Sequence, residues 1–252
     1  MAIMKQLTKY ILQKILGFKT YLYIFSLFVI VKIRWDKKEK DFFHFVGLLP
    51  PKGIVLDLGA NIGVTTYHLA KSLPRSTIFS FEPLEINMNV LKRIRKRFRL
   101  GNIREFQMAA GDKNTRLEMV MPVIDNVPMH GLSHVLHEDI TENNNGLRFE
   151  VPMVRLDDFD PLKNITERIT GFKIDVENFE YFVLKGAEEL ILKHQPVIYC
   201  ELWENENRQK CISFLNKSGY TAFILQGKKL VPFEGEKHRK HNFFFIPGSS
   251  NT

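Results

Sequence analysis

Five acidic residues stand at or just beyond the ends of short, largely apolar runs in this 252-residue sequence. They are Asp57, Glu82, Asp175, Glu177 and Glu201. The runs have the pattern of strands that are buried on both faces of a parallel sheet. Because ligands of open α/β sheets bind outside the carboxyl ends of the strands, we expect these carboxylates to meet at one functional site. Carboxylates there can hold hydroxyl groups by charge-assisted hydrogen bonds or remove a proton as a general base.

The turn after the first of these runs has the spacing D-x-G-x-x-x-G. Glycine allows the backbone to bend sharply and to approach a ligand closely. The spacing differs from the G-x-G-x-x-G of a dinucleotide site, and the aspartate would repel a phosphate placed near it. A cofactor that lacks phosphates but carries a positive centre and a free amino group is compatible with this turn. The candidate cofactor contacts in the turn are Asp57, Gly59, Ala60, Asn61 and Gly63.

The second strand-like run, Thr77–Phe81, ends in Glu82-Pro83. In doubly wound folds an acid at this point accepts both hydroxyls of an adenosine ribose. Ala110 and Asp112 follow the third run and fall where the adenine would lie, and Asp112 could accept a hydrogen bond from the exocyclic amine. S-adenosylmethionine has a ribose, an adenine, a sulfonium and an amino-acid tail. We therefore predict it as the cofactor, with Glu82, Pro83, Ala110 and Asp112 as further contacts.

Strand and helix signals alternate along the main part of the chain. This alternation predicts the α/β class, with a doubly wound, mostly parallel seven-stranded sheet and an antiparallel final strand at an edge. Two extra strands are expected at Arg116–Met121 and Phe149–Arg155, separated by an irregular segment, Pro122–Gly146. One helix is expected over Phe179–Leu192.

Pro50-Pro51 divides a basic and apolar helical arm, residues 1–49, from the main domain, residues 50–252. The uncharged run Thr20–Val31 is short for a membrane-spanning helix, which needs about 20 apolar residues. Three alternatives remain open: an interfacial anchor on a membrane surface, a short membrane segment, or an apolar arm packed on the domain or on a second subunit. We expect a cytoplasmic protein, and membrane-surface contact through residues 1–35 stays open.

The composition is that of a soluble globular protein, with 44% apolar and 25% charged residues. Part of the net charge of +8 comes from the basic run Lys92–Arg99, which we interpret as the solvated face of a helix. No nucleic-acid partner is expected, because neither an N-P-P-Y motif nor an aromatic stacking platform is present. Cys200 and Cys211 match no zinc spacing and are expected to be reduced core thiols.

Several motifs together resemble the FkbM family of S-adenosylmethionine-dependent methyltransferases. They are V-L-D-L-G-A-N-I-G, F-S-F-E-P, V-P-M-V-R-L-D-D-F, F-K-I-D-V-E-N-F-E with V-L-K-G-A, and P-V-I-Y-C-E-L, within about residues 50 to 248. The resemblance implies a Rossmann-like class I methyltransferase that methylates a hydroxyl of a sugar, a glycan or a polyketide-type natural product. Asn178 replaces a glycine of the family pattern. Asn tolerates a left-handed backbone, so the turn can survive; if that glycine makes room for substrate, the acceptor here differs.

Transfer of a methyl group to a hydroxyl requires an aligned acceptor and benefits from a base. The candidate catalytic residues are Asp175, Glu177 and Glu201. Asp175 and Glu177, spaced i, i+2, would point the same way in an extended stretch. Glu180 and His134 are candidate substrate contacts, and His134 lies in the irregular segment, which could cover the site.

Alternatives to this assignment remain. The acids could bind a divalent metal, although we predict no metal, and Glu180 could merely stabilise a helix N-terminus. His130 is a second histidine in the irregular segment and a further base candidate. The chain could also be a non-catalytic adenosylmethionine-binding or membrane-associated protein of the same fold. The glycine spacing disfavours a nicotinamide-dependent oxidoreductase.

Overall fold

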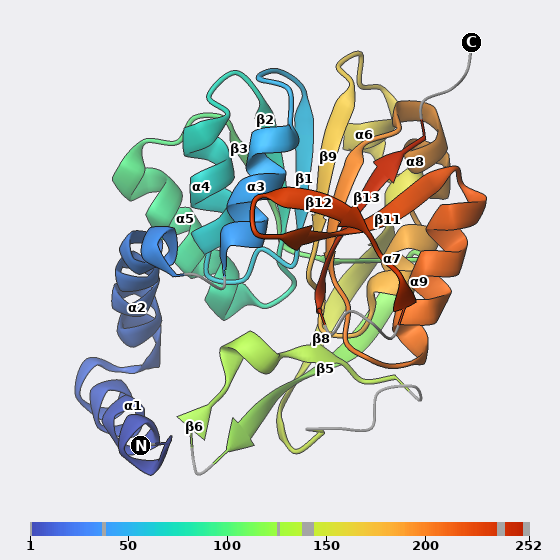
Figure 1. The fold of residues 1–252 in the computed structure, drawn as a ribbon. Helices are drawn as coiled ribbons and strands as arrows, with labels where there is room; N and C mark the ends of the chain where they lie inside the picture. Colours follow the sequence, from blue (N-terminus) through green and yellow to red (C-terminus); the bar gives the residue numbers. More distant parts are fainter. Residues whose placement is uncertain (1, 37–38, 125–126, 138–143, 236–239, 249–252) are drawn as a thin grey trace.

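The computed structural model describes residues 2–36, 39–124, 127–137, 144–235 and 240–248 (Figure 1). Its centre is an eight-stranded sheet in the order β12-β11-β13-β10-β9-β1-β2-β3. The strands are β1 (Ile54–Leu58), β2 (Thr77–Phe81), β3 (Ile103–Phe106), β9 (Ile169–Ile174), β10 (Val197–Glu201), β11 (Tyr220–Gln226), β12 (Lys229–Pro232) and β13 (Asn242–Pro247). The strands from β10 to β3 are parallel. The predicted mostly parallel α/β sheet is thereby confirmed.

The antiparallel final strand β13 lies inside the sheet, between β10 and β11, and not at an edge as expected. Phe243, Phe244 and Phe245 of this strand are fully buried. Because successive side chains of a strand point to opposite faces, such a strand needs cover on both faces, which the interior of the sheet provides. The edge is formed by β12, which pairs antiparallel with β11 and makes the strand count eight where seven were expected.

Helices cover both faces of the sheet and bury two separate apolar cores against it. One face carries α3 (Lys40–Leu48), α4 (Val64–Ser72) and α5 (Glu85–Phe98), and the other carries α7 (Glu180–Lys185), α8 (Glu188–His194) and α9 (Glu206–Lys217). Leu91 and Ile94 of α5 are buried as expected, while Lys92, Lys96 and Arg97 are exposed. The basic run is therefore the solvated face of a helix.

The single helix expected over Phe179–Leu192 is divided into α7 and α8 at Gly186. A Cβ at this position would lie 1.8 Å from the carbonyl oxygen of Gly111. Glycine is required because the backbone at Gly111 passes this point at close range.

A second, smaller sheet lies below the main domain in Figure 1. Its strands are β4 (Ala109–Gly111), β5 (Thr115–Ile124), β6 (Val127–Pro128), β7 (His134–Val135) and β8 (Gly146–Arg155). The two long antiparallel partners, β5 and β8, confirm both expected extra strands and extend each of them into the segment expected to be irregular. Residues 125–126 and 138–143 of that segment lie outside the described residues.

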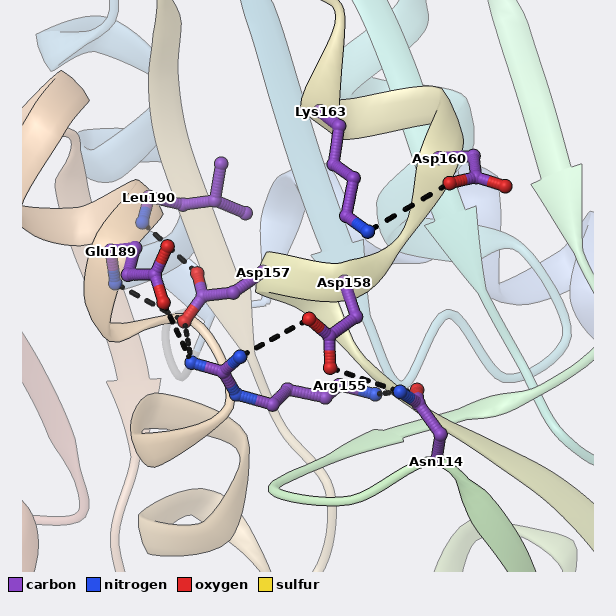
Figure 2. A network of polar contacts seen from close by, with 8 residues as sticks. All are labelled: Asn114, Arg155, Asp157, Asp158, Asp160, Lys163, Glu189 and Leu190. Atoms are coloured by element: carbon purple, nitrogen blue, oxygen red, sulfur yellow. Dashed lines mark hydrogen bonds and ion pairs between the residues drawn. The ribbon is translucent and has the colours of Figure 1, made fainter.

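Arg155, at the end of β8, anchors the small sheet to the main domain (Figure 2). Its guanidinium group contacts Asp157 at 2.9 Å, Asp158 at 3.2 Å and Glu189 at 3.0 Å. Asp157 also accepts hydrogen bonds from the backbone N–H groups of Glu189 and Leu190, at the start of α8. The R-L-D-D stretch therefore joins β8 to the helical layer.

The N-terminal arm consists of α1 (Ala2–Leu16) and α2 (Phe18–Lys32), which meet at Gly17 with a φ of 73°. Leu22 and Ile30 of α2 are buried against Val90 and Ile94 of α5. The first turns of the arm lie beside the small sheet, where α1 contacts β6 (Figure 1). No described helix combines the length and the apolar content needed to cross a membrane.

Candidate active site

Two glycines in the turn after β1 bring the ends of neighbouring elements into contact. Gly59 has a φ of 80°, and a Cβ there would lie 1.9 Å from the carbonyl oxygen of Asp175. Only glycine avoids both the strain of the left-handed backbone and this overlap. Gly63 also has a φ of 80° and packs its backbone against Leu91 of α5. The turn therefore sets the distance between the ends of β1 and β9.

Glu82 follows β2 and is almost completely buried. Its Oε2 accepts a hydrogen bond from the backbone N–H of Asn61 at 2.9 Å. Its Oε1 accepts from the backbone N–H of Leu84 at 3.0 Å and from Asn87 Nδ2 at 3.2 Å. Burial raises the pKa of Glu82 to about 7, although these hydrogen bonds act in the opposite direction. A carboxylate offers about four acceptor positions, so Glu82 can still accept from a hydroxyl.

A cavity opens between this turn, the ends of β2 and β9, and residues 130–135. Five of the predicted cofactor contacts line it: Gly59, Asn61, Glu82, Pro83 and Ala110. Phe81, Met108 and Met119 add apolar surface. Flat apolar walls suit an adenine ring, and the buried carboxylate suits a ribose. The residues present thus fit an adenosine-containing cofactor without phosphates.

Four of the predicted cofactor contacts do not line this cavity: Asp57, Ala60, Gly63 and Asp112. Asp57 is fully buried, and its Oδ2 accepts hydrogen bonds from the hydroxyls of Thr65 at 3.0 Å and Thr66 at 2.6 Å. Asp112 lies 3.4 Å from Lys185 Nζ. Asp57 and Asp112 are thus engaged by protein side chains outside the cavity.

Lys173 is a buried cation that the sequence pattern did not single out. Its Nζ lies 3.4 Å from Asp57 Oδ1 and 3.4 Å from Asp175 Oδ2, and it donates a hydrogen bond to the carbonyl oxygen of Gly59 at 2.9 Å. Burial lowers the pKa of Lys173, but the two carboxylates outweigh that effect and the pKa is raised. The signal in the sequence was a lysine inside the otherwise apolar strand G-F-K-I. Lys173 connects the glycine turn to Asp175.

The chain turns sharply after β9 and brings Asp175 and Glu177 to the same cavity. The predicted extended geometry is wrong at Glu177, whose φ is 53°; Asn178 has a φ of 73°, which confirms its left-handed conformation. Glu180 holds this turn, because it accepts hydrogen bonds from the backbone N–H of Asn178 at 3.1 Å and from Asn207 Nδ2 at 2.6 Å. Glu180 is buried and does not line this cavity.

The carboxyl group of Glu177 has a much higher pKa than a carboxyl group at the protein surface. Burial, followed by repulsion from Asp175, Glu201 and Glu180, raises its pKa to about 9. The Glu177 side chain is therefore mostly protonated at neutral pH and can donate a hydrogen bond into the cavity. Burial likewise raises the pKa of Glu180 to about 7.

A second cavity borders the ends of β9 and β10 on the side of α3. We call it the acid-lined cavity, because its acidic lining residues are Asp175, Glu201, Glu39 and Asp41. Glu39 and Asp41 lie at the start of α3, and sequence motifs did not point to either of them. Asp175 is the only described residue that lines both cavities.

Tyr199 also lines the acid-lined cavity, beside Lys173 in the sheet register. Its side chain is 7% exposed. Burial, then Asp41, Glu201 and other acids raise its pKa. Burial and Asp175 raise the pKa of Glu201 to about 7. Besides the carboxylates and this phenol, Lys173 and Lys240 line the cavity, so it presents both acceptors and donors to a ligand.

The two histidines of the irregular segment have different surroundings. His130 lines the cofactor cavity, and its Nδ1 lies 3.1 Å from Asn61 Oδ1; burial lowers its pKa to about 4. His134, the predicted substrate contact, lines neither cavity. Its Nδ1 lies 2.9 Å from the carbonyl oxygen of Leu132, and its Nε2 lies 3.0 Å from Asn144 Oδ1. His130 therefore occupies the position at the site that was expected for His134.

The acids do not assemble into a metal centre. Within the described part of the chain, no group of three or more His, Cys, Asp or Glu residues is arranged to hold a metal ion. Cys200 and Cys211 are both buried free thiols, as their apolar surroundings predicted.

The glycine turn after β1, the acid after β2 and the mixed eight-stranded sheet form a Rossmann-like fold. A family model described as the methyltransferase FkbM domain matches residues 57–229. The chain belongs to the FkbM methyltransferase family, and the resemblance of its motifs is confirmed. An FkbM methyltransferase from Methylobacillus flagellatus KT has the same fold, with a TM-score of 0.53 and 18% identity, over 79% of this chain and 45% of that one.

Two curated relatives extend the comparison. The AMB antimetabolite synthetase AmbE of Pseudomonas aeruginosa is 27% identical over 215 residues, which cover 71% of this chain and 10% of the synthetase. Methyltransferase 1 of Beauveria bassiana is 25% identical over 158 residues, which cover 57% of this chain and 62% of the relative. The matched region is thus a small part of the first relative and less than two thirds of the second.

Proposed function

We propose that this FkbM-family methyltransferase uses S-adenosylmethionine to methylate a hydroxyl group of a small molecule. The observation that carries the proposal is the position of Asp175, which lines both the cofactor cavity and the acid-lined cavity. A base between donor and acceptor sites can remove the acceptor proton as the new bond forms. When bound, the cofactor would supply the methyl group for direct displacement.

The residues of the cofactor cavity would bind and orient the donor. Glu82 would accept hydrogen bonds from the ribose hydroxyls, and Phe81 and Met108 would contact the adenine through apolar surface. Asn61 and Pro83 would complete the wall. The two neighbours of the turn, Asp57 and Lys173, would keep the backbone of Gly59 in place. Alignment of this kind supplies much of the rate of a displacement.

The acid-lined cavity would hold the acceptor. Glu201 and Glu39 can accept hydrogen bonds from hydroxyl groups, and the phenol of Tyr199 can donate one. Several acceptors around one cavity suit a sugar, a glycan or a polyketide-type natural product that carries more than one hydroxyl. The name of the Pseudomonas relative, an antimetabolite synthetase, agrees with a natural-product acceptor.

The proposal is tested by calorimetry followed by an acceptor screen. The full chain should bind S-adenosylmethionine and should not bind NAD, because the glycine spacing lacks the dinucleotide pattern. Radiolabelled S-adenosylmethionine should then transfer its methyl group to a hydroxyl in a panel of sugars, glycans and polyketide-type compounds. Failure to bind S-adenosylmethionine would overturn the cofactor assignment. Binding without transfer to any acceptor would favour the alternative of a non-catalytic adenosylmethionine-binding protein.

A further inference from the structure

Residues 11–35, which run from α1 to just beyond α2, carry most of the exposed large hydrophobic side chains among the described residues. Ten large hydrophobic side chains are exposed among the described residues, and seven of them lie within residues 11–35. These seven are Ile11, Leu12, Ile15, Ile24, Phe28, Val31 and Trp35. Such a concentration is unusual for scattered surface residues and is typical of an interaction site.

The exposed residues of α2 form one continuous stripe. Ile24, Phe28 and Val31 are spaced by four and three residues, and Trp35 follows four residues later. Residues at such spacing share one face of a helix. The opposite face, with Leu22 and other buried residues, packs on the methyltransferase domain. We call the exposed stripe of α2, together with Ile11, Leu12 and Ile15 of α1, the outer face of the arm.

Contacts with the domain hold α2 in this orientation. Ser26 Oγ donates a buried hydrogen bond to the carbonyl oxygen of Ile62 at 2.9 Å. His68 Nε2 lies 3.1 Å from the carbonyl oxygen of Ile30. The Arg93 guanidinium lies 3.8 Å from the centre of the Tyr23 ring. The inner face of α2 is therefore occupied, and its outer face cannot be buried by rotation of the helix.

The charge of the arm indicates what covers the outer face. Residues 1–35 contain six basic residues and no acidic residue. Lys14, Lys19, Lys32 and Arg34 are exposed. Basic side chains next to apolar ones favour an anionic lipid surface. Trp35, which is 76% exposed at the end of the arm, is a residue type that prefers the membrane interface.

We propose that the outer face of the arm docks on the surface of an anionic lipid bilayer, with α2 lying in the interface. The length of α2 agrees with this orientation, because its 15 residues span about 22 Å at 1.5 Å per residue, less than the hydrocarbon core of about 30 Å. A second copy of the chain is a poorer occupant of the same face. Self-association through it would bring together two copies of residues 1–35, each with six positive charges.

The experiment measures co-sedimentation of the full chain with lipid vesicles. Vesicles of phosphatidylcholine mixed with phosphatidylglycerol should bind the protein at least about tenfold more strongly than vesicles of phosphatidylcholine alone. Substitution of the stripe, Ile24→Ser with Phe28→Ser and Val31→Ser, should reduce binding to the mixed vesicles by at least about tenfold. Charge reversal, Lys14→Glu with Lys32→Glu, should abolish the preference for the anionic lipid.

The matched control is Leu147→Ser with Leu192→Ser, which removes two exposed leucines (48% and 52%) outside the arm. This control should bind vesicles as the unchanged chain does. Circular dichroism melting verifies that each variant is folded. Absence of binding to the mixed vesicles would overturn the proposal, as would an equal loss in the control. A dimer in light scattering that the triple substitution dissociates would show that a second copy covers the outer face, and would also overturn it.

Discussion

The two cavities that meet at Asp175 are constructed in different ways. The cofactor cavity depends on backbone geometry: Gly59 must be glycine for steric reasons, and Glu82 is held by backbone N–H groups. The acid-lined cavity depends on side chains that separate parts of the chain contribute, among them Glu39 before α3 and Glu201 at the end of β10. Side chains can be exchanged without moving the backbone. Under the proposed function, the acid-lined cavity would therefore be the region where acceptor preference varies while donor binding stays constant.

The largest effect is expected at the residue that the cavities share. Asp175→Asn should lower turnover about 10² to 10⁴-fold, the usual contribution of a general base. The affinity for S-adenosylmethionine should change little, because Asn keeps the shape of the side chain and Lys173 keeps its contact with Asp57. Methyl transfer is measured with labelled donor, and affinity by calorimetry. The control is Asp160→Asn, an exposed acid that lines neither cavity.

Unchanged turnover in Asp175→Asn would remove this residue from the role of base. A loss of cofactor affinity as large as the loss of turnover would contradict the division of roles between the two cavities, because Asp175 would then contribute mainly to cofactor binding. The Asp160→Asn control should leave both quantities unchanged.

The second largest effect is expected on the stability of the fold when a methyl group is added at Gly59. Gly59→Ala should destabilise the fold by about 3 kcal/mol or more, because left-handed strain adds to overlap with the backbone of Asp175. Gly219 offers a matched control, since its φ is 85° but a Cβ there would meet nothing within 4 Å. Gly219→Ala should cost only about 1 kcal/mol. Urea unfolding measures both values, and equal losses would show that the close approach at Gly59 is unimportant.

The smallest effect is expected from a residue of the acid-lined cavity alone. Glu201→Gln should raise the KM for the acceptor about tenfold, as expected for loss of a hydrogen bond to a charged group. The Kd for S-adenosylmethionine should stay the same. Steady-state kinetics with the acceptor found in the screen checks the first value, and calorimetry checks the second. A change in the cofactor Kd would show that the two cavities are not independent.

The raised pKa of Glu201 predicts that the KM for the acceptor depends on pH. The pKa of Glu201 is raised to about 7, chiefly by burial, so the carboxylate takes up a proton as the pH falls through neutrality and loses an acceptor position. The KM of the unchanged enzyme should therefore rise between about pH 8 and about pH 6, a range that spans this pKa. Glu201→Gln should flatten this part of the profile. A profile that is unaltered by the substitution would assign the dependence to another group.

Much of the cofactor cavity could be predicted from the sequence because its parts are local. A strand, a glycine turn and a following helix occupy one continuous stretch around Gly59, and Glu82 ends the next strand. Other residues could not be found in this way. Glu39 and Asp41 precede the first motif, and only the packing of α3 against Tyr199 brings them to the site. His130 and His134 are four residues apart in an irregular segment, which has no periodicity from which their directions could be predicted.

By itself, the sequence determined the α/β class, the turn after β1, the strand-end acids and the left-handed position at Asn178. Each follows from properties of neighbouring residues: apolar periodicity, missing Cβ atoms and backbone preferences. The tertiary structure alone decided that Lys173 joins Asp57 to Asp175, that Asp175 borders two cavities, and that one face of α2 packs while the other stays exposed. These features depend on contacts between residues far apart in the chain. Local sequence patterns do not predict which distant side chains the sheet register and the helix packing bring together.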